Sequence, residues 1–147
     1  MSTEMSTGVS YDNDNIFARI LRGELPAHKV YEDAETFAFL DIMPRADGHL
    51  LVIPKTPARN LLDASPEQMA AVMGAVQKLS NAALAAYEAD GVTIQQFNEA
   101  AGGQEVFHLH FHVLPRFEGQ RLRSPGTMAD GDVLKQHADK LRAVLAG

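Results

Sequence analysis

The stretch "VFHLHFHVLPR", Val106 to Arg116, places three histidines at alternate positions of an otherwise apolar run. Successive side chains of a β-strand point to opposite faces. His108, His110 and His112 are therefore predicted to share one face of a strand, and the apolar residues between them the other. The pattern predicts a core strand with a functional site on one side.

Segments upstream of this run predict the rest of the sheet. They are short, rich in β-branched, aromatic or leucine residues, and separated by Asp, Pro and Gly, which favours antiparallel pairing. Their sequences are "KVYE" (29–32), "TFAFLDI" (36–42), "HLLVIP" (49–54) and "GVTIQQFN" (91–98).

Helical patterns surround these strands. Apolar residues at helical spacing predict a short helix within 15–26 and an amphipathic helix over 132–146. Ser65 and Gln68 form a capping box, with Pro66 at the first helical position, which predicts the start of a long helix. The expected fold class is α+β, with an antiparallel sheet of about five strands covered by the long helix and the C-terminal helix.

The domain organisation is simple. Residues 1–13 carry no periodic apolar pattern and are expected to form a flexible tail, followed by a single domain over 14–147. A chain of 147 residues is long enough for one core.

Composition and charge exclude several function classes. With 46% hydrophobic and 22% charged residues, the chain is typical of a globular protein that neither spans nor binds a membrane. A net charge of −6 repels nucleic acid. The polar first ten residues predict no signal peptide and hence a cytoplasmic location.

Two kinds of chemistry fit the histidines. Cysteine is absent, which excludes a thiol nucleophile and a cysteine-ligated metal. On a regular strand, His108 and His112 would lie about 13 Å apart, so a zinc ion would need two of the three histidines plus a ligand such as His49. The other chemistry is nucleophilic attack by a neutral imidazole, which needs neither metal nor cofactor. Gly102 and Gly103 precede the strand and would let backbone N–H groups approach an anion, which favours phosphorus as the electrophile.

The sequence resembles the histidine triad (HIT) family of nucleotide hydrolases and transferases, in particular its short bacterial members. The resemblance rests on the His-x-His-x-His pattern preceded by "GGQEV", and on "IFARILRGELPAHKVYED", "FAFLDIMP" and "GHLLVIPK" upstream. It implies a HIT-like fold that forms a homodimer. It also implies cleavage of an α-phosphate bond in a purine nucleoside monophosphate derivative, of the dinucleoside polyphosphate or nucleoside phosphoramidate type, through a nucleotidyl-histidine intermediate.

The resemblance also implies roles for individual residues. His110 would be the nucleophile, His112 would contact the phosphate and the leaving group, and His108 and His49 would orient their neighbours. Asp41 would accept both ribose hydroxyls, which suits a carboxylate because it can take two donors. The remaining implied nucleotide-binding residues are Asn98, Gln104 and Gly103 around the phosphate, and Ile16, Phe17, Ile20, Leu25, Phe39 and Ile42 around the base.

The chain departs from the family pattern in three places. Residues 15–18 read Asn-Ile-Phe-Ala where many bacterial relatives have Cys-x-x-Cys, so their structural zinc is expected to be missing. Glu105 occupies the place of a small hydroxyl residue found in some phosphoramidases. Arg116, Arg121 and Arg123 lie in a segment that differs from the phosphoramidase branch, where they would either meet outgoing phosphates or be solvated.

Two alternative functions stay open at this point. One is a regulatory protein that binds a nucleotide and turns it over slowly. The other is a metalloprotein with histidine ligands.

Overall fold

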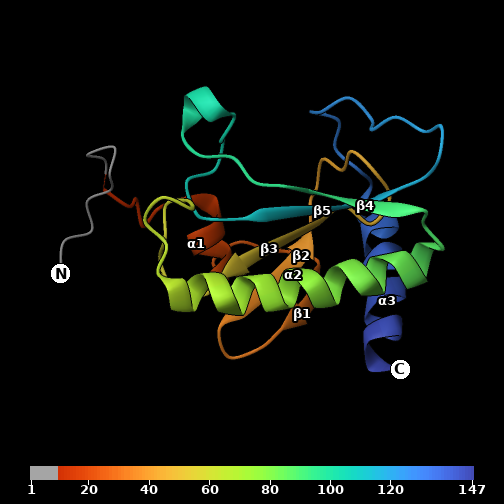
Figure 1. Cartoon of the computed structure of the whole chain (residues 1–147), viewed down its shortest axis with the longest axis horizontal. Helices are drawn as coiled ribbons and strands as arrows, with labels where there is room; N and C mark the ends of the chain where they lie inside the picture. The colour runs from red at the N-terminus through yellow and green to blue at the C-terminus, as the bar shows by residue number, and fades with distance from the viewer. Residues whose placement is uncertain (1–9) are drawn as a thin grey trace.

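A five-stranded antiparallel sheet forms the centre of the described part of the chain, residues 10–147 of the computed structural model (Figure 1). The strand order is β1-β2-β3-β5-β4, and the expected antiparallel α+β architecture is confirmed. The strands are β1 (Lys29–Glu32), β2 (Thr36–Leu40), β3 (Leu50–Pro54), β4 (Gly91–Gln95) and β5 (Phe111–Arg116).

The long helix α2 (Pro66–Tyr87) covers one face of the sheet. It begins where the sequence predicts, because the Ser65 side chain accepts from the Gln68 amide and the Gln68 side chain accepts from the Ser65 amide. This reciprocal bonding satisfies amides that have no partner inside the helix. The main core lies between α2 and the sheet and includes Val72, Val76, Leu79, Leu50, Val52 and Val113.

Helix α3 (Gly131–Ala146) packs crosswise against α2 and the β1–β2 end of the sheet. Asp130 caps its first turn, and Leu141 is fully buried in the main core. None of the helices within residues 10–147 combines the length and hydropathy needed to cross a membrane.

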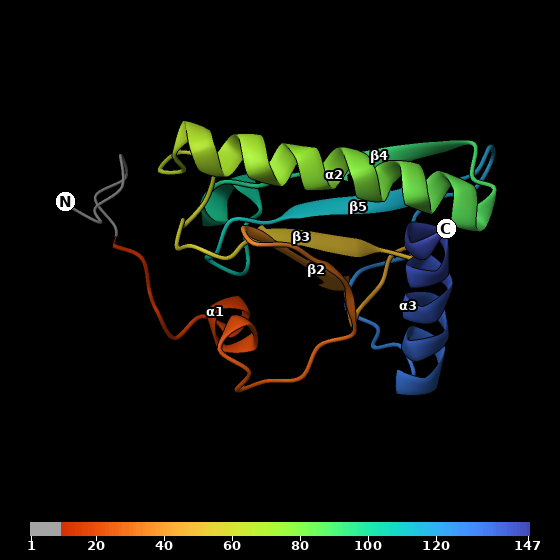
Figure 2. The same cartoon turned by 90° about the horizontal axis from the view of Figure 1, so that it is seen from below.

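The short helix α1 (Ile16–Leu21) lies on the opposite face of the sheet from α2 (Figure 2). Its N-terminus is capped by the Asn15 side chain, which accepts from the Ala18 amide. Phe17 packs there on Phe39 in a second apolar cluster, whose buried members are Phe17, Phe39, Leu51 and Ile53. The candidate residues His110 and His112 lie on this face, where His110 packs against Phe17 of α1.

The histidine run departs from the expected strand. β5 begins only at Phe111, and residues 105–110 form no ladder with a neighbour. The pairing of β5 with β3 reaches no further back than Phe111, and its pairing with β4 ends at His112. The prediction of one strand that carries all three histidines is therefore wrong in its first half, and of the three only His112 lies on the sheet.

The expected tail falls mostly on residues 1–9, which lie outside the described residues. Within residues 10–13, Tyr11 is half-buried and its hydroxyl lies 2.5 Å from Nδ1 of His108. The packed part of the chain thus begins before residue 14, the expected start of the domain.

Candidate active site

The register of the sheet brings Asp41, His49 and His112 together. Phe39 pairs with Leu51, and the Asp41 amide donates to the His49 carbonyl, so Asp41 and His49 lie opposite each other just beyond the ends of β2 and β3. Leu51 in turn pairs with His112 on β5. All these side chains share the face that α1 covers, because residues in register point the same way.

A directed hydrogen-bond chain fixes the proton positions on two of these histidines. The Arg45 backbone N–H can only donate, and it lies 3.1 Å from Nδ1 of His49. Nε2 of neutral His49 must therefore carry the proton, which it donates over 2.9 Å to Nδ1 of His112. The remaining nitrogen of His112, Nε2, then carries a proton of its own. His112 consequently offers the site a hydrogen-bond donor.

His110 has the opposite polarity. Its Nδ1–H donates over 2.6 Å to the backbone carbonyl of His108, which leaves Nε2 as an unprotonated nitrogen. The ring is 8% exposed and stands edge-on to Phe17, with centroids 5.0 Å apart, and to His112, with centroids 5.2 Å apart. The site therefore pairs a nucleophilic nitrogen with a hydrogen-bond donor.

His108 is enclosed in the protein rather than open to a ligand. It is 1% exposed, and its Nε2–H donates over 2.9 Å to the Pro54 carbonyl. Its Nδ1 then accepts from the Tyr11 hydroxyl. Both ring nitrogens are used, so the expected supporting role of His108 fits its contacts.

Burial keeps all four imidazoles neutral near pH 7. Desolvation lowers the pKa of His49 and of His108 to about 4, and that of His112 to about 3. It also lowers the pKa of His110 from its ordinary value. A neutral imidazole keeps the lone pair that nucleophilic attack needs.

A family model for the HIT domain matches residues 22–119, a range that includes His49, His108, His110 and His112. The chain belongs to the HIT family. Its five-stranded antiparallel sheet agrees with the folds of solved HIT structures.

Several HIT proteins illustrate the similarity. A Hit-like protein involved in cell-cycle regulation from Bartonella henselae is 52% identical, with a TM-score of 0.88 over 91% of this chain and 98% of that one. Adenosine 5'-monophosphoramidase HNT1 from Saccharomyces cerevisiae is 34% identical over 99% of this chain and 92% of its own length. Adenylylsulfatase HINT3 from Arabidopsis thaliana is 37% identical over 88% of this chain and 62% of its own length.

Asp41 lies next to His49 and His112. One oxygen accepts from the Met43 amide over 2.8 Å, and the other lies 3.6 Å from Nε2 of His49. Burial, and secondarily the nearby Glu105 carboxylate, raises the pKa of Asp41. The side chain is 22% exposed, so a ligand can reach it.

The residues expected around the base divide into two groups. Phe17 and Phe39 are buried in the small apolar cluster, with Ile20 packed against it. Ile16 and Ile42 are 48% and 46% exposed, and Leu25 is half-buried. Ile16 and Ile42 are accessible to a ligand, whereas Phe17 and Phe39 are not; the base-binding role of these residues stays a prediction.

The loop expected to hold the phosphate is braced from within. Gln104 is 4% exposed, and its amide oxygen accepts from Asn60 and the Glu99 backbone while its nitrogen donates to two backbone carbonyls. No hydrogen-bonding group of Gln104 is left for a phosphate, so we propose that it shapes the loop instead. The Asn98 oxygen accepts from the Leu61 amide, and its nitrogen donates to Gln96.

Gly103 has a φ of +99°, a conformation that side chains rarely adopt. A Cβ there would lie 3.2 Å from the ring of Phe97. Phe97 in turn stands edge-on to His112 at 5.7 Å. The glycine lets the loop pass close to the ring that supports His112.

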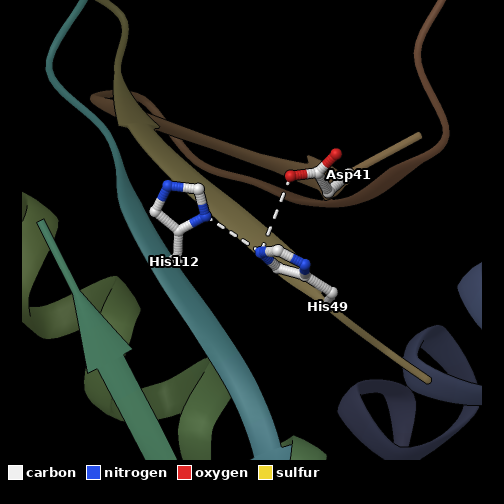
Figure 3. A group of neighbouring side chains, drawn as sticks. All are labelled: Asp41, His49 and His112. Carbon is white, nitrogen blue, oxygen red and sulfur yellow. Dashed lines mark hydrogen bonds and ion pairs between the residues drawn. The ribbon is translucent and has the colours of Figure 1, made fainter. Parts of the chain in front are cut away.

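The ligand atoms of Asp41, His49 and His112 lie within 4.8 Å of one another and are chemically able to hold a metal ion (Figure 3). The hydrogen bonds argue against this use. Coordination through Nε2 of His49 would move its proton to Nδ1, directly against the Arg45 N–H. Two donors would then face each other, so this conformation favours a hydrogen-bond relay over a metal centre.

The arginines after the triad make contacts of their own. Arg116 donates to the Thr93 hydroxyl, and Arg123 pairs with Asp47. Arg121 is exposed.

Sequence reasoning missed two groups that shape the site. Tyr11 lies in the expected tail, and no periodicity marks it. The buried Arg59 forms an ion pair with Glu99, 40 residues away in sequence. The positive φ of Glu99 was not predictable, because glutamate rarely adopts it.

Proposed function

We propose that this chain is a nucleotide-binding hydrolase or transferase that cleaves an α-phosphate bond of a nucleoside phosphate derivative through a nucleotidyl-histidine intermediate. The observation that carries the proposal is the unprotonated Nε2 of His110 beside His112, which presents Nε2–H. Similarity to proteins named as an adenylylsulfatase and an adenosine monophosphoramidase supports this chemistry.

The reaction takes two steps. Nε2 of His110 attacks the α-phosphorus, a P–N bond forms, and the bond to the leaving group breaks. The departing atom accepts a hydrogen bond from Nε2–H of His112; it leaves as a phosphate or sulfate anion, or, if it is an amine, takes its proton from water. The His108 carbonyl, bonded to the Nδ1–H of His110, stabilises the positive charge that develops on the substituted ring. Water then attacks phosphorus and breaks the P–N bond, which releases the nucleoside monophosphate, frees Nε2 of His110 and passes the proton of the water to solvent.

Asp41 binds the ribose in this proposal. Its carboxylate takes both hydroxyls from a position next to His112, so the sugar lies beside the attacked phosphorus. The exposed Ile16 and Ile42 contact the purine base.

The functional form is proposed to be a homodimer. β4 ends the sheet, and an unpaired strand edge readily pairs with a second copy. Ile94 on this strand is a large apolar side chain that is 43% exposed in the single chain, and the second copy of a dimer would cover it. Light scattering should then give about twice the 16.0 kDa of the chain.

A substrate panel tests the proposal. Purified protein is incubated with adenosine 5'-monophosphoramidate, adenylylsulfate and diadenosine polyphosphates, and release of AMP is followed by chromatography. We expect AMP from at least one compound and none with His110→Ala. Equal rates for wild type and His110→Ala would reject the proposed nucleophile.

The two alternative functions make different predictions in the same assay. A regulatory nucleotide-binding protein would bind AMP and form no product even in a single turnover. A metalloprotein would lose activity with EDTA and regain it with zinc, whereas the proposed chemistry is unchanged by the chelator.

A further inference from the structure

The segment that carries His108 and His110 does not pair with any strand of the sheet, so other contacts must hold it in place. Its backbone is tied to the loop at residues 58–63. The Leu109 amide donates over 2.8 Å to the Ala58 carbonyl, and the Gln104 side chain donates over 2.7 Å to the Arg59 carbonyl. The position of His110 therefore depends on this loop.

Arg59 is the centre of the connection. Its Nε and one Nη donate to both oxygens of Glu99, over 2.8 and 2.9 Å, and Asn60 donates to the same carboxylate over 2.7 Å. The guanidinium carbon also lies 4.1 Å from the ring centroid of Phe107, the residue before His108. Arg59 is 9% exposed and the Glu99 side chain 23%, so the ion pair is partly shielded from water. A planar guanidinium can make both kinds of contact at once, which an ammonium cannot.

Glu99 has an unfavourable backbone conformation, with φ +65° and ψ 162°. This region is essentially restricted to glycine, and a residue stays there only when its surroundings hold it. The side chain is held by Arg59 and Asn60, and the backbone N–H donates over 2.8 Å to the Gln104 side chain. Its carbonyl accepts from the amides of Gly102 and Gln104. Because several contacts hold Glu99 in this unfavourable conformation close to the segment that carries His110, we infer that it positions this segment.

We propose that Arg59 and Glu99 are positioning residues: their ion pair, packed on Phe107, holds the 98–109 segment so that the His108 carbonyl keeps Nε2 of His110 unprotonated and aimed at phosphorus. This inference rests on the proposed function. Neither residue touches the reacting atoms. Both act through Gln104, which donates to the Val106 carbonyl, and through Phe107.

The effect on catalysis follows from the geometry. The bond from His110 Nδ1 to the His108 carbonyl depends on the backbone conformation between these two residues, so a change in that conformation alters both the direction of Nε2 and the tautomer of His110. A misplacement of about 1 Å can cost roughly 100-fold in rate. The nucleoside contacts at Asp41 lie beyond the end of β2 and should not move.

Two substitutions at Glu99 test whether the ion pair acts by holding the unfavourable backbone conformation of this residue. Glu99→Ala removes the carboxylate and keeps the unfavourable φ, so the loop should relax. Glu99→Gly removes the same carboxylate but permits the native φ. In rapid-quench single turnovers with adenosine 5'-monophosphoramidate, we expect Glu99→Ala to form the histidine adduct roughly 10- to 100-fold more slowly. Glu99→Gly should recover most of the loss, and the AMP dissociation constant should stay within about twofold for both.

Glu88 provides a matched control. It is a second glutamate with positive φ, 48°, at the C-terminal end of α2, away from the triad. Glu88→Ala and Glu88→Gly should differ in melting temperature and leave the adduct rate unchanged. Arg59→Lys keeps the charge but loses the two-pronged contact, and it should slow adduct formation as Glu99→Ala does. It also tests the inference if Glu99→Ala does not fold.

A readout that needs no turnover separates this inference from the proposed function. In ¹⁵N-histidine NMR, His110 should show one tautomer with Nδ1–H in wild type and Glu99→Gly, and a mixture in Glu99→Ala. An inactive wild type with this tautomer pattern would reject the function and keep the inference. A native tautomer and near-normal adduct rate in folded Glu99→Ala would overturn the inference, as would equal losses in the Ala and Gly variants.

Discussion

The hydrogen-bond relay from the Arg45 N–H through His49 to His112 can be tested by two substitutions of His49. His49 receives the Arg45 N–H at Nδ1 and donates from Nε2 to His112. Asn at position 49 retains an acceptor near the Nδ1 position but cannot reach His112. Gln retains an N–H donor near the Nε2 position. His49→Asn should therefore break the relay, whereas His49→Gln should preserve much of it.

The size of the expected loss in kcat follows from the burial of the hydrogen bond between His49 and His112. His112 Nδ1 would lose its donor in a site where His49 is only 2% exposed. An unsatisfied buried acceptor costs about 1 to 3 kcal/mol. If His112 recovers this energy by moving its proton to Nδ1, its Nε2 no longer donates to the leaving group. The same energy then appears in the barrier, which corresponds to roughly 5- to 150-fold in kcat.

The assay is steady-state hydrolysis of the best substrate from the panel, with guanidinium unfolding as a check on the fold. We expect His49→Asn to lose about 10- to 100-fold in kcat with a smaller change in KM, and His49→Gln to retain most activity. Equal losses in the two variants, or a His49→Asn enzyme with normal kcat, would refute the relay.

The remaining predictions concern the ribose site, the Tyr11 contact and pH. Asp41→Ala should weaken AMP binding by about 1.5 to 3 kcal/mol in calorimetry and weaken 2'-deoxy-AMP less, while equal losses would remove Asp41 from the ribose site. Tyr11→Phe should lower the unfolding free energy by about 1 to 2 kcal/mol, because it removes the donor to the buried Nδ1 of His108. Unchanged stability in denaturant would contradict the packed N-terminal segment. Because burial lowers the pKa of His110, kcat/KM should stay flat as pH falls to 6.5, the ordinary histidine pKa, and decline only below it. The stability contributed by His49 and His108 should be lost between pH 6.5 and about 4, where the unfolded chain takes up protons and the folded protein does not. Constant stability across this window, relative to a variant lacking both histidines, would disprove their burial as neutral groups.

Features of the fold that depend on neighbouring residues could be predicted from the sequence. The capping box at Ser65 and Gln68 placed the start of α2 correctly, because it depends only on neighbouring residues. The alternation of His112 with its apolar neighbours correctly indicated a strand with two distinct faces.

The site was less predictable where distant segments decide the geometry. The periodicity of the sequence does not indicate that β3 and β4 pair with β5 only from Phe111 onward. His108 and His110 were therefore expected on the strand, although they precede it. The family resemblance implied that Gln104 binds the phosphate, whereas its side chain makes four hydrogen bonds within the protein, which no sequence pattern indicates. The Tyr11 contact with His108 joins residues 97 apart, and no local pattern encodes it.

The central claim is that the unprotonated Nε2 of His110 attacks phosphorus, and trapping the intermediate tests it most directly. Wild-type protein is mixed with excess substrate, quenched within milliseconds under basic conditions that preserve a P–N bond, and analysed by intact and peptide mass spectrometry. The account predicts a nucleotidyl adduct that maps to His110, forms no more slowly than turnover, and is absent from His110→Ala. Turnover in the wild type without any adduct, together with near-normal activity of His110→Ala, would contradict it.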